Sequence, residues 1–283
     1  MDKTMLAALM PQKPTKEESG IHSILYGEPK SGKTTTLDDP NMKVLLLDME
    51  GGESVLAGSP NVDIIKIKSL EMLNAYFELL ASGKWLNFEG KVVPLEHGLV
   101  AGDSITALCD LVKDYVVRVV APNRKREITD PSLPPVQRFG AQSDWGNYGT
   151  ILVDIVKGVH QLTKRGKQSI NFKWLAHKEN KYENPNAENQ ITGTQIKMQG
   201  SSVAVVMSVV DAIFYMNKAE VTNPKDKTEK KIVHFIQTTK IGITEAGVRQ
   251  SKREERLPDK IANPVWSDIY TKLGYRIEPP VQK

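Results

Sequence analysis

The segment Gly27-Glu28-Pro29-Lys30-Ser31-Gly32-Lys33-Thr34 constrains the fold of this chain more than any other feature. It matches the phosphate-binding loop pattern G-x-x-x-x-G-K-[ST], in which backbone N–H groups surround phosphate oxygens. The apolar stretch 21–26 before it is short enough for a buried strand, and 34–37 can begin a helix that Asp38-Asp39-Pro40 ends early. The pattern therefore predicts a strand–loop–helix unit that binds the phosphates of a nucleotide.

Two side chains of this loop have expected roles. Lys33 should reach the β- and γ-phosphates, and the Thr34 hydroxyl should ligate Mg²⁺, so ATP and Mg²⁺ are the expected ligands. A chance Gly-rich turn is a weak alternative, because average composition yields roughly one such match per hundred chains of this length. The predicted nucleotide-binding residues are Gly27, Glu28, Pro29, Lys30, Ser31, Gly32, Lys33, Thr34 and Thr35.

Length and composition favour a soluble α/β protein. With 283 residues, 40% of them hydrophobic, the chain can hold one large domain or two small ones. The single cysteine, Cys109, excludes an intrachain disulfide framework and fits a reducing compartment. No apolar run reaches the roughly 18 residues of a membrane span. We therefore expect a cytoplasmic protein without membrane contact, in the host-cell cytoplasm if a phage encodes it. The net charge of +4 alone says little about partners.

Two further apolar runs end in acidic residues. Residues 43–48 and 99–103 are nearly continuous in apolar side chains, as in parallel strands that are covered on both faces. The second run ends in Asp103-Ser104, the Walker B pattern, so Asp103 is the predicted metal-site carboxylate together with Thr34. Gly102 precedes it, at a position where a bulky apolar residue would pack better.

Strand and helix patterns alternate along most of the chain. The predicted fold class is therefore α/β, with a doubly wound, mainly parallel sheet, helices on both faces and a C-terminal β-hairpin extension. Long polar connections are predicted at 121–143 and 178–202. The predicted helices lie at 70–80, 104–120, 146–165 and 264–273, and further strands at 62–67, 169–177 and 231–239.

Three segments divide the predicted chain. Residues 1–20 form an arm, residues 21–262 the ATPase core, and residues 263–283 a C-terminal helix and tail. The apolar patch 5–10 in the arm is consistent either with a disordered tail or with a segment that docks on a neighbouring subunit.

The order of the motifs resembles the RecA-like ATPases. A phosphate loop is followed by a strand that ends Asp48-Met49-Glu50 and then by one that ends Asp103-Ser104. The chain resembles more closely the small phage-encoded RecA-like ATPases, some of which act as single-strand annealing recombinases. The shared features, over about residues 20–262, are the Asp-x-Glu-Gly-Gly turn, Trp145-Gly146-x-Tyr148, Ala176-His177 and a basic segment before Leu257-Pro258.

The resemblance implies catalytic roles for several residues. Glu50 stands where the family's glutamate activates the attacking water, whereas Asp48 is expected to be structural. His177 stands where a polar side chain senses the γ-phosphate and connects to a DNA-binding loop. In such proteins a cation of the next protomer reaches the γ-phosphate; here Arg253 is the first choice and Lys252 the second. The family's adenine contacts cannot be assigned to residues of this chain, because Gly51-Gly52 replaces the RecA segment that helps to hold adenine.

The two long connections are basic and follow neighbouring strands. The RecA-like fold turns such loops toward DNA, where cations neutralise phosphates and aromatic side chains such as Phe139, Trp145 and Tyr182 stack on bases. A solvated surface would show the same charge pattern. The predicted DNA-binding residues are Arg124, Lys125, Arg126, Arg138, Lys178, Lys181 and Lys197.

Three functions stay open at this point. The first is an oligomeric, DNA-stimulated ATPase that binds single-stranded DNA in phage recombination, annealing or repair, with a single-stranded DNA-binding protein as a further partner. The second is a monomeric P-loop kinase of a small molecule. The third is a DNA-binding module in which ATP drives assembly without significant turnover. The sequence does not distinguish a ring from a filament or a dimer.

Overall fold

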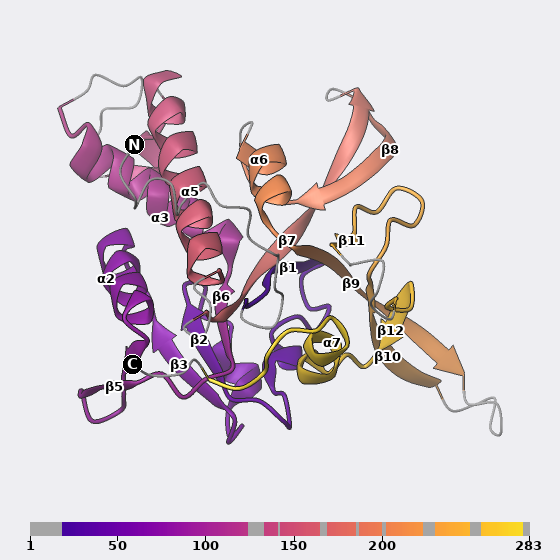
Figure 1. Cartoon of the computed structure of the whole chain (residues 1–283). Helices are drawn as coiled ribbons and strands as arrows, with labels where there is room; N and C mark the ends of the chain where they lie inside the picture. Colours follow the sequence, from indigo (N-terminus) through magenta and orange to yellow (C-terminus); the bar gives the residue numbers. More distant parts are fainter. Residues whose placement is uncertain are drawn as a thin grey trace, which may run out of the picture.

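A computed structural model describes residues 19–123, 133–140, 142–164, 169–184, 187–199, 202–222, 230–249 and 256–279. Its central sheet has the strand order β12-β10-β9-β1-β7-β6-β2-β3, shown in Figure 1. The six strands from β9 to β3 in this order are mutually parallel. They are β1 (His22–Gly27), β2 (Val44–Asp48), β3 (Val62–Lys66), β6 (Leu99–Asp103), β7 (Asn171–Asn184) and β9 (Ala212–Thr222).

Antiparallel strands extend the sheet and form its hairpins. β10 (Lys230–Gln237) returns beside β9, and β12 (Lys260–Ala262) closes that edge. β8 (Ala187–Ile196) pairs with β7, and β11 (Gly247–Val248) pairs with β9. β4 (Lys84–Leu86) and β5 (Val92–Pro94) form a separate hairpin.

Alternate residues of the buried strands face two hydrophobic cores. Ile24 and Tyr26 of β1 join one core, and Leu25 joins the other, as the two-residue period of a strand requires. The first core is covered by α2 (Leu70–Ala81), α3 (Ile105–Tyr115), α5 (Gln142–Leu162) and α6 (Ser202–Val209). The second is covered by η1 (Thr35–Leu37) and α7 (Trp266–Lys272). The predicted α/β fold class, with helices on both faces and a C-terminal hairpin, is confirmed.

Short helical segments complete the fold. They are η2 (Glu53–Leu56), the π turn η3 (Val116–Val120) after α3, and α4 (Pro135–Arg138) before α5. The helix predicted after the phosphate loop is reduced to the single turn η1. No helix among the described residues is long and apolar enough to cross a membrane.

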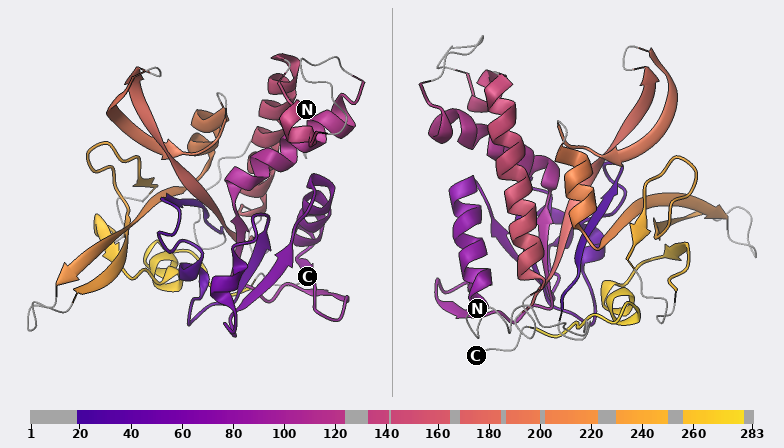
Figure 2. Two further views of the ribbon diagram at one scale, coloured as in Figure 1. Left: turned by 180° about the vertical axis from the view of Figure 1, so that it is seen from behind. Right: turned by 45° about the horizontal axis from the view of Figure 1, so that its top comes forward.

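The second predicted connection is largely a β-hairpin. We expected a strand to end at His177 and a polar connection to follow, but β7 continues to Asn184 and pairs with β8 over Lys178–Ile196. Figure 2 shows this hairpin projecting beyond the sheet. The polar composition of the hairpin misled the prediction, because a two-stranded ribbon with both faces near solvent lacks the apolar alternation of a half-buried strand.

Gly102 has a packing reason. A Cβ atom at this position would lie 2.5 Å from the indole ring of Trp174, its register partner on β7. The expectation that a bulky residue would pack better here is wrong, because the neighbouring strand already supplies the bulk.

Candidate nucleotide site

The carboxyl ends of β1, β2 and β6 meet at one edge of the sheet, beside His177 of β7. Parallel strands place the residues that follow them at the same edge, and the phosphate loop follows β1 there. The cavity at this edge has a volume of about 540 Å³. Its lining includes Lys33, Thr34, Glu50, Asp103, His177 and His234.

Lys33 lies within the loop that carries it. Its Nζ donates to the carbonyl oxygens of Gly27, at 3.2 Å, and Glu28, at 2.9 Å. Burial lowers the pKa of this ammonium group, and the carboxylates of Asp103 and Glu50 oppose that shift. The Lys33 ammonium group therefore already lies in the cavity, and phosphate oxygens can replace the two backbone carbonyls as its hydrogen-bond acceptors.

The Thr34 and Asp103 side chains, which the sequence predicts to hold a metal ion, contact each other. The Thr34 hydroxyl donates to Asp103 Oδ2 at 2.8 Å. Burial raises the pKa of the Asp103 carboxyl, so a nearby divalent cation would stabilise its charged form. A hydroxyl and a carboxylate are the hard oxygen ligands that Mg²⁺ prefers, and this donor set therefore fits Mg²⁺.

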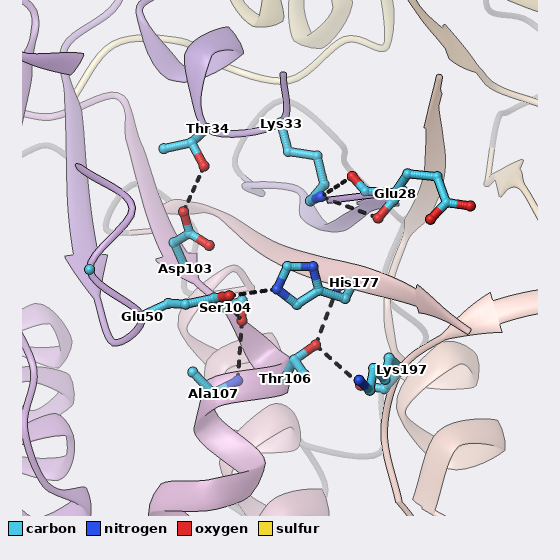
Figure 3. Close-up of polar contacts among 12 residues, drawn as sticks. Glu28, Lys33, Thr34, Glu50, Asp103, Ser104, Thr106, Ala107, His177 and Lys197 are labelled. Atoms are coloured by element: carbon cyan, nitrogen blue, oxygen red, sulfur yellow. Dashed lines mark hydrogen bonds and ion pairs between the residues drawn. The ribbon is translucent and has the colours of Figure 1, made fainter. Parts of the chain in front are cut away.

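Glu50 is held by two side-chain donors, which Figure 3 shows converging on it. Ser104 Oγ donates to Glu50 Oε2 at 2.6 Å, and His177 Nε2 lies 2.6 Å from Glu50 Oε1. The hydrogen bond from His177 is the main reason why the pKa of Glu50 lies below its ordinary value, and partial burial opposes it. Glu50 is therefore an oriented carboxylate that is ionised at neutral pH.

Asp48 shapes the turn that presents Glu50. Its Oδ1 accepts hydrogen bonds from the backbone N–H groups of Glu50, at 3.2 Å, and Gly51, at 2.8 Å. Gly51 has a φ of 85°, a conformation that favours glycine. These contacts agree with the structural role expected for Asp48.

His177 connects this site to the base of the β7–β8 hairpin. Its backbone N–H donates to Thr106 Oγ1 at 3.2 Å, and its carbonyl accepts from the Lys197 N–H at 2.7 Å. The Thr106 hydroxyl in turn donates to the Lys197 carbonyl at 3.2 Å. One residue thus contacts the Glu50 carboxylate through its side chain and the hairpin through its backbone.

Sequence reasoning missed two contacts of the phosphate loop. His234 Nδ1 donates to the Ser31 carbonyl at 2.7 Å, and the imidazole covers Gly32 so closely that a Cβ atom there would lie 2.8 Å from it. The Glu28 carboxylate pairs with Lys178 at 2.5 Å. No local motif marks His234, since only the pairing of β1 with β9 and of β9 with β10 brings it near. Ser104 carried a signal, because it caps α3 by accepting from the Ala107 N–H.

The predicted DNA-binding residues lie in different surroundings. Lys181 and Lys197 are exposed on the β7–β8 hairpin or directly after it. Lys178 is only 15% exposed and faces the phosphate loop through Glu28. Arg138 is half-buried at the end of α4. Arg124, Lys125 and Arg126, like Lys252 and Arg253, lie outside the described residues, as does the predicted arm apart from residues 19 and 20.

Comparisons with known proteins place these features in a family. Flagellar accessory protein FlaH from Methanocaldococcus jannaschii matches with 10% sequence identity and a TM-score of 0.35, over 87% of this chain and 85% of that chain. Comparison with curated proteins gives no match. A family model described as an AAA domain matches residues 19–244, which include the phosphate loop, Glu50, Asp103 and His177. The chain therefore belongs to this AAA-domain family of P-loop nucleotide-binding proteins.

Proposed function

We propose that this protein is a Mg²⁺-dependent ATPase of the phage RecA-like type that binds single-stranded DNA and supports recombination, annealing or repair. The observation that carries the proposal is the position of His177. It contacts Glu50 in the nucleotide site and ties the first residues of the β7–β8 hairpin to α3 and Lys197.

Within one protomer, the nucleotide site supports this proposal with four side chains that suit hydrolysis of a γ-phosphate: Lys33, Thr34, Asp103 and Glu50. Lys33 exchanges its backbone partners for phosphate oxygens. Thr34 and Asp103 would hold Mg²⁺, which would neutralise charge on the phosphates. Glu50 accepts a proton from the attacking water. Its two existing hydrogen bonds leave lone pairs on both carboxylate oxygens, because a carboxylate has about four acceptor sites.

His177 relates the state of the nucleotide to the hairpin. A γ-phosphate beside Glu50 competes for the hydrogen bond that His177 now makes. A shift of the imidazole then moves the His177 backbone at the start of the hairpin, which is hydrogen-bonded to Thr106 and Lys197. We infer that ATP binding shifts this arrangement between two states.

DNA contacts are proposed for the exposed basic side chains beyond that point. Lys181 and Lys197 supply charge, and the Arg124-Lys125-Arg126 segment before α4 supplies more. Trp145, with 39% of its surface exposed, stands edge-on to Phe139 with ring centroids 4.8 Å apart. Such an aromatic platform stacks on bases without selecting a sequence. Single-stranded DNA, and with it a single-stranded DNA-binding protein, are the proposed partners.

Assembly completes the proposed site. Arg253, or Lys252 as second choice, reaches the γ-phosphate of a neighbouring protomer, since a guanidinium stays charged and grips phosphate oxygens with two N–H groups. Arg253→Ala protein should bind ATP but hydrolyse it poorly. Mixing it with Lys33→Ala protein should restore part of the activity, because one mixed interface joins an intact loop to an intact arginine. No recovery in protein shown to co-assemble would reject the trans role.

The rate of ATP hydrolysis with and without single-stranded DNA tests the proposal. The DNA-stimulated ATPase should turn over faster with DNA. A small-molecule kinase, the alternative from another enzyme class, should be indifferent to DNA. An assembly module should bind DNA when ATP is present but show negligible turnover under both conditions.

A further inference from the structure

We propose, resting on the proposed ATP-binding function, that the nucleoside of the bound nucleotide occupies a second cavity between η1 and the segment Asn263–Val265. This cavity has a volume of about 220 Å³. It lies on the side of the phosphate loop away from Glu50 and Asp103, between the loop and the edge strands β10 and β12. The proposal assigns to the C-terminal segment the recognition of the base.

The second cavity adjoins the first. Both are lined by Gly32, Thr35 and His234, so a single ligand can pass from one into the other over the end of the phosphate loop. The opposite direction leads to Gly51, Gly52 and Val55, and Val55 is 58% exposed there. A base on that side would lie on an open turn rather than between two walls.

The charges of the two cavities indicate which end of the nucleotide each cavity binds. The first cavity contains Lys30 and Lys33. Of its two carboxylates, Asp103 accepts a hydrogen bond from Thr34, and Glu50 is held by Ser104 and His177. The second cavity contains Asp38 and Asp39 and, among the described residues, no lysine or arginine. Phosphate groups are therefore repelled from the second cavity, whereas an uncharged nucleoside with N–H and O–H donors is compatible with it.

Hydrogen bonds fix the walls of the second cavity to each other. Trp266 Nε1 donates to Thr36 Oγ1 at 3.2 Å, and the Ser267 N–H donates to Asp39 Oδ2 at 2.8 Å. The Asn263 N–H donates to the His234 carbonyl at 2.7 Å. The cavity is thus built before any ligand arrives, which reduces the entropy lost on binding.

The side chains of the far wall suit a planar heterocycle. Pro264 and Val265 offer apolar surface, and the exposed Asn263 has a backbone φ of 44°, a conformation that asparagine tolerates. Within the described residues the Asn263 amide makes no hydrogen bond. It therefore has a donor and an acceptor available for the edge of a base.

Photo-crosslinking with 8-azido-ATP tests the location directly. The label should appear on the tryptic peptide 261–272, which contains Asn263, Pro264 and Val265, and excess unlabelled ATP should prevent this labelling. Label on the peptide 44–66, which contains Gly51, Gly52 and Val55, would overturn the proposal. So would the lack of ATP-protected label on 261–272 in protein that binds ATP.

Titration with ATP and with inorganic tripolyphosphate separates this proposal from the function on which it rests. Asn263→Gly removes the amide and suits the positive φ, so ATP binding should weaken about fivefold while tripolyphosphate binding stays within about twofold. Asp268→Asn, on the other side of the same segment, is the control and should change neither. Equal weakening of both ligands, or no change in either, would contradict the nucleoside assignment. Wild-type protein that binds neither ligand would refute the nucleotide function itself.

Discussion

The strand-end site and the β7–β8 hairpin differ in how their charged side chains are held. At the strand ends the side chains of Lys33, Asp103 and Glu50 are each hydrogen-bonded within the protein. Burial and these hydrogen bonds shift their pKa values. On the hairpin, Lys178 near the base pairs with Glu28, whereas Lys181 farther out is exposed. Chemistry needs the first arrangement, in which geometry is fixed beforehand, whereas binding to a phosphate backbone needs only charge at the surface. Single substitutions should therefore cause large losses of nucleotide binding or hydrolysis at the strand ends and only small losses of DNA affinity on the hairpin.

The largest effect is expected at Lys33. Lys33→Ala removes the ammonium that contacts the Gly27 and Glu28 carbonyls. Lys30, the other lysine of the motif, lines the cavity, but these two contacts belong to Lys33. Nucleotide binding or turnover should be abolished, as measured by titration and by phosphate release. A thermal melt like that of the wild type is the control for folding. Unchanged ATPase activity would refute the assignment of the phosphate loop.

The next effect is expected at Glu50. Glu50→Gln keeps the size and the contact with Ser104 but cannot take a proton from water. Hydrolysis should fall by roughly 10²-fold or more while ATP binding persists. Turnover within a few-fold of the wild type would make Glu50 structural and require another carboxylate.

A smaller effect, on stability, is expected beneath the site. Gly102→Ala places a Cβ against the Trp174 ring, and overpacking of this kind costs about 1–3 kcal/mol of the free energy of unfolding. Urea denaturation measures it. Gly158→Ala on α5 is the matched control, because nothing lies within 4 Å of the added Cβ, and it should be neutral or stabilising. Equal stability of the two variants would contradict the packing role of Gly102.

The smallest effects are expected on the hairpin. Lys181→Ala and Lys197→Ala should each reduce the magnitude of the negative slope of log affinity for single-stranded DNA against log salt concentration by roughly 0.7, with little change in basal ATPase activity. Fluorescence anisotropy across a salt series measures the slope. Slopes equal to that of the wild type would mean that these lysines face solvent only.

The sequence predicted that the residues of the strand-end site lie together, because each of them ends or follows a stretch with a strong apolar pattern, although His177 proved to lie within β7 rather than at its end. Phosphate loop, Glu50, Asp103 and His177 were placed at one edge by that rule, and the structure has them there. The contact between His234 and the Ser31 carbonyl was not predictable, because it depends on the order of strands across the sheet. The length of β7 was missed because its outer half is polar. Gly102 looked unfavourable because its partner, Trp174, lies 72 positions along the chain.

We propose that His177 couples the nucleotide site to the β7–β8 hairpin, and the ratio of ATPase rates with and without single-stranded DNA tests this coupling. This ratio should exceed one in the wild type and in a His160→Ala control. In His177→Ala protein it should fall to about one while ATP and DNA still bind, because the link between Glu50 and the backbone of the hairpin is lost. A His177→Ala protein that DNA stimulates as strongly as the wild type would contradict the account.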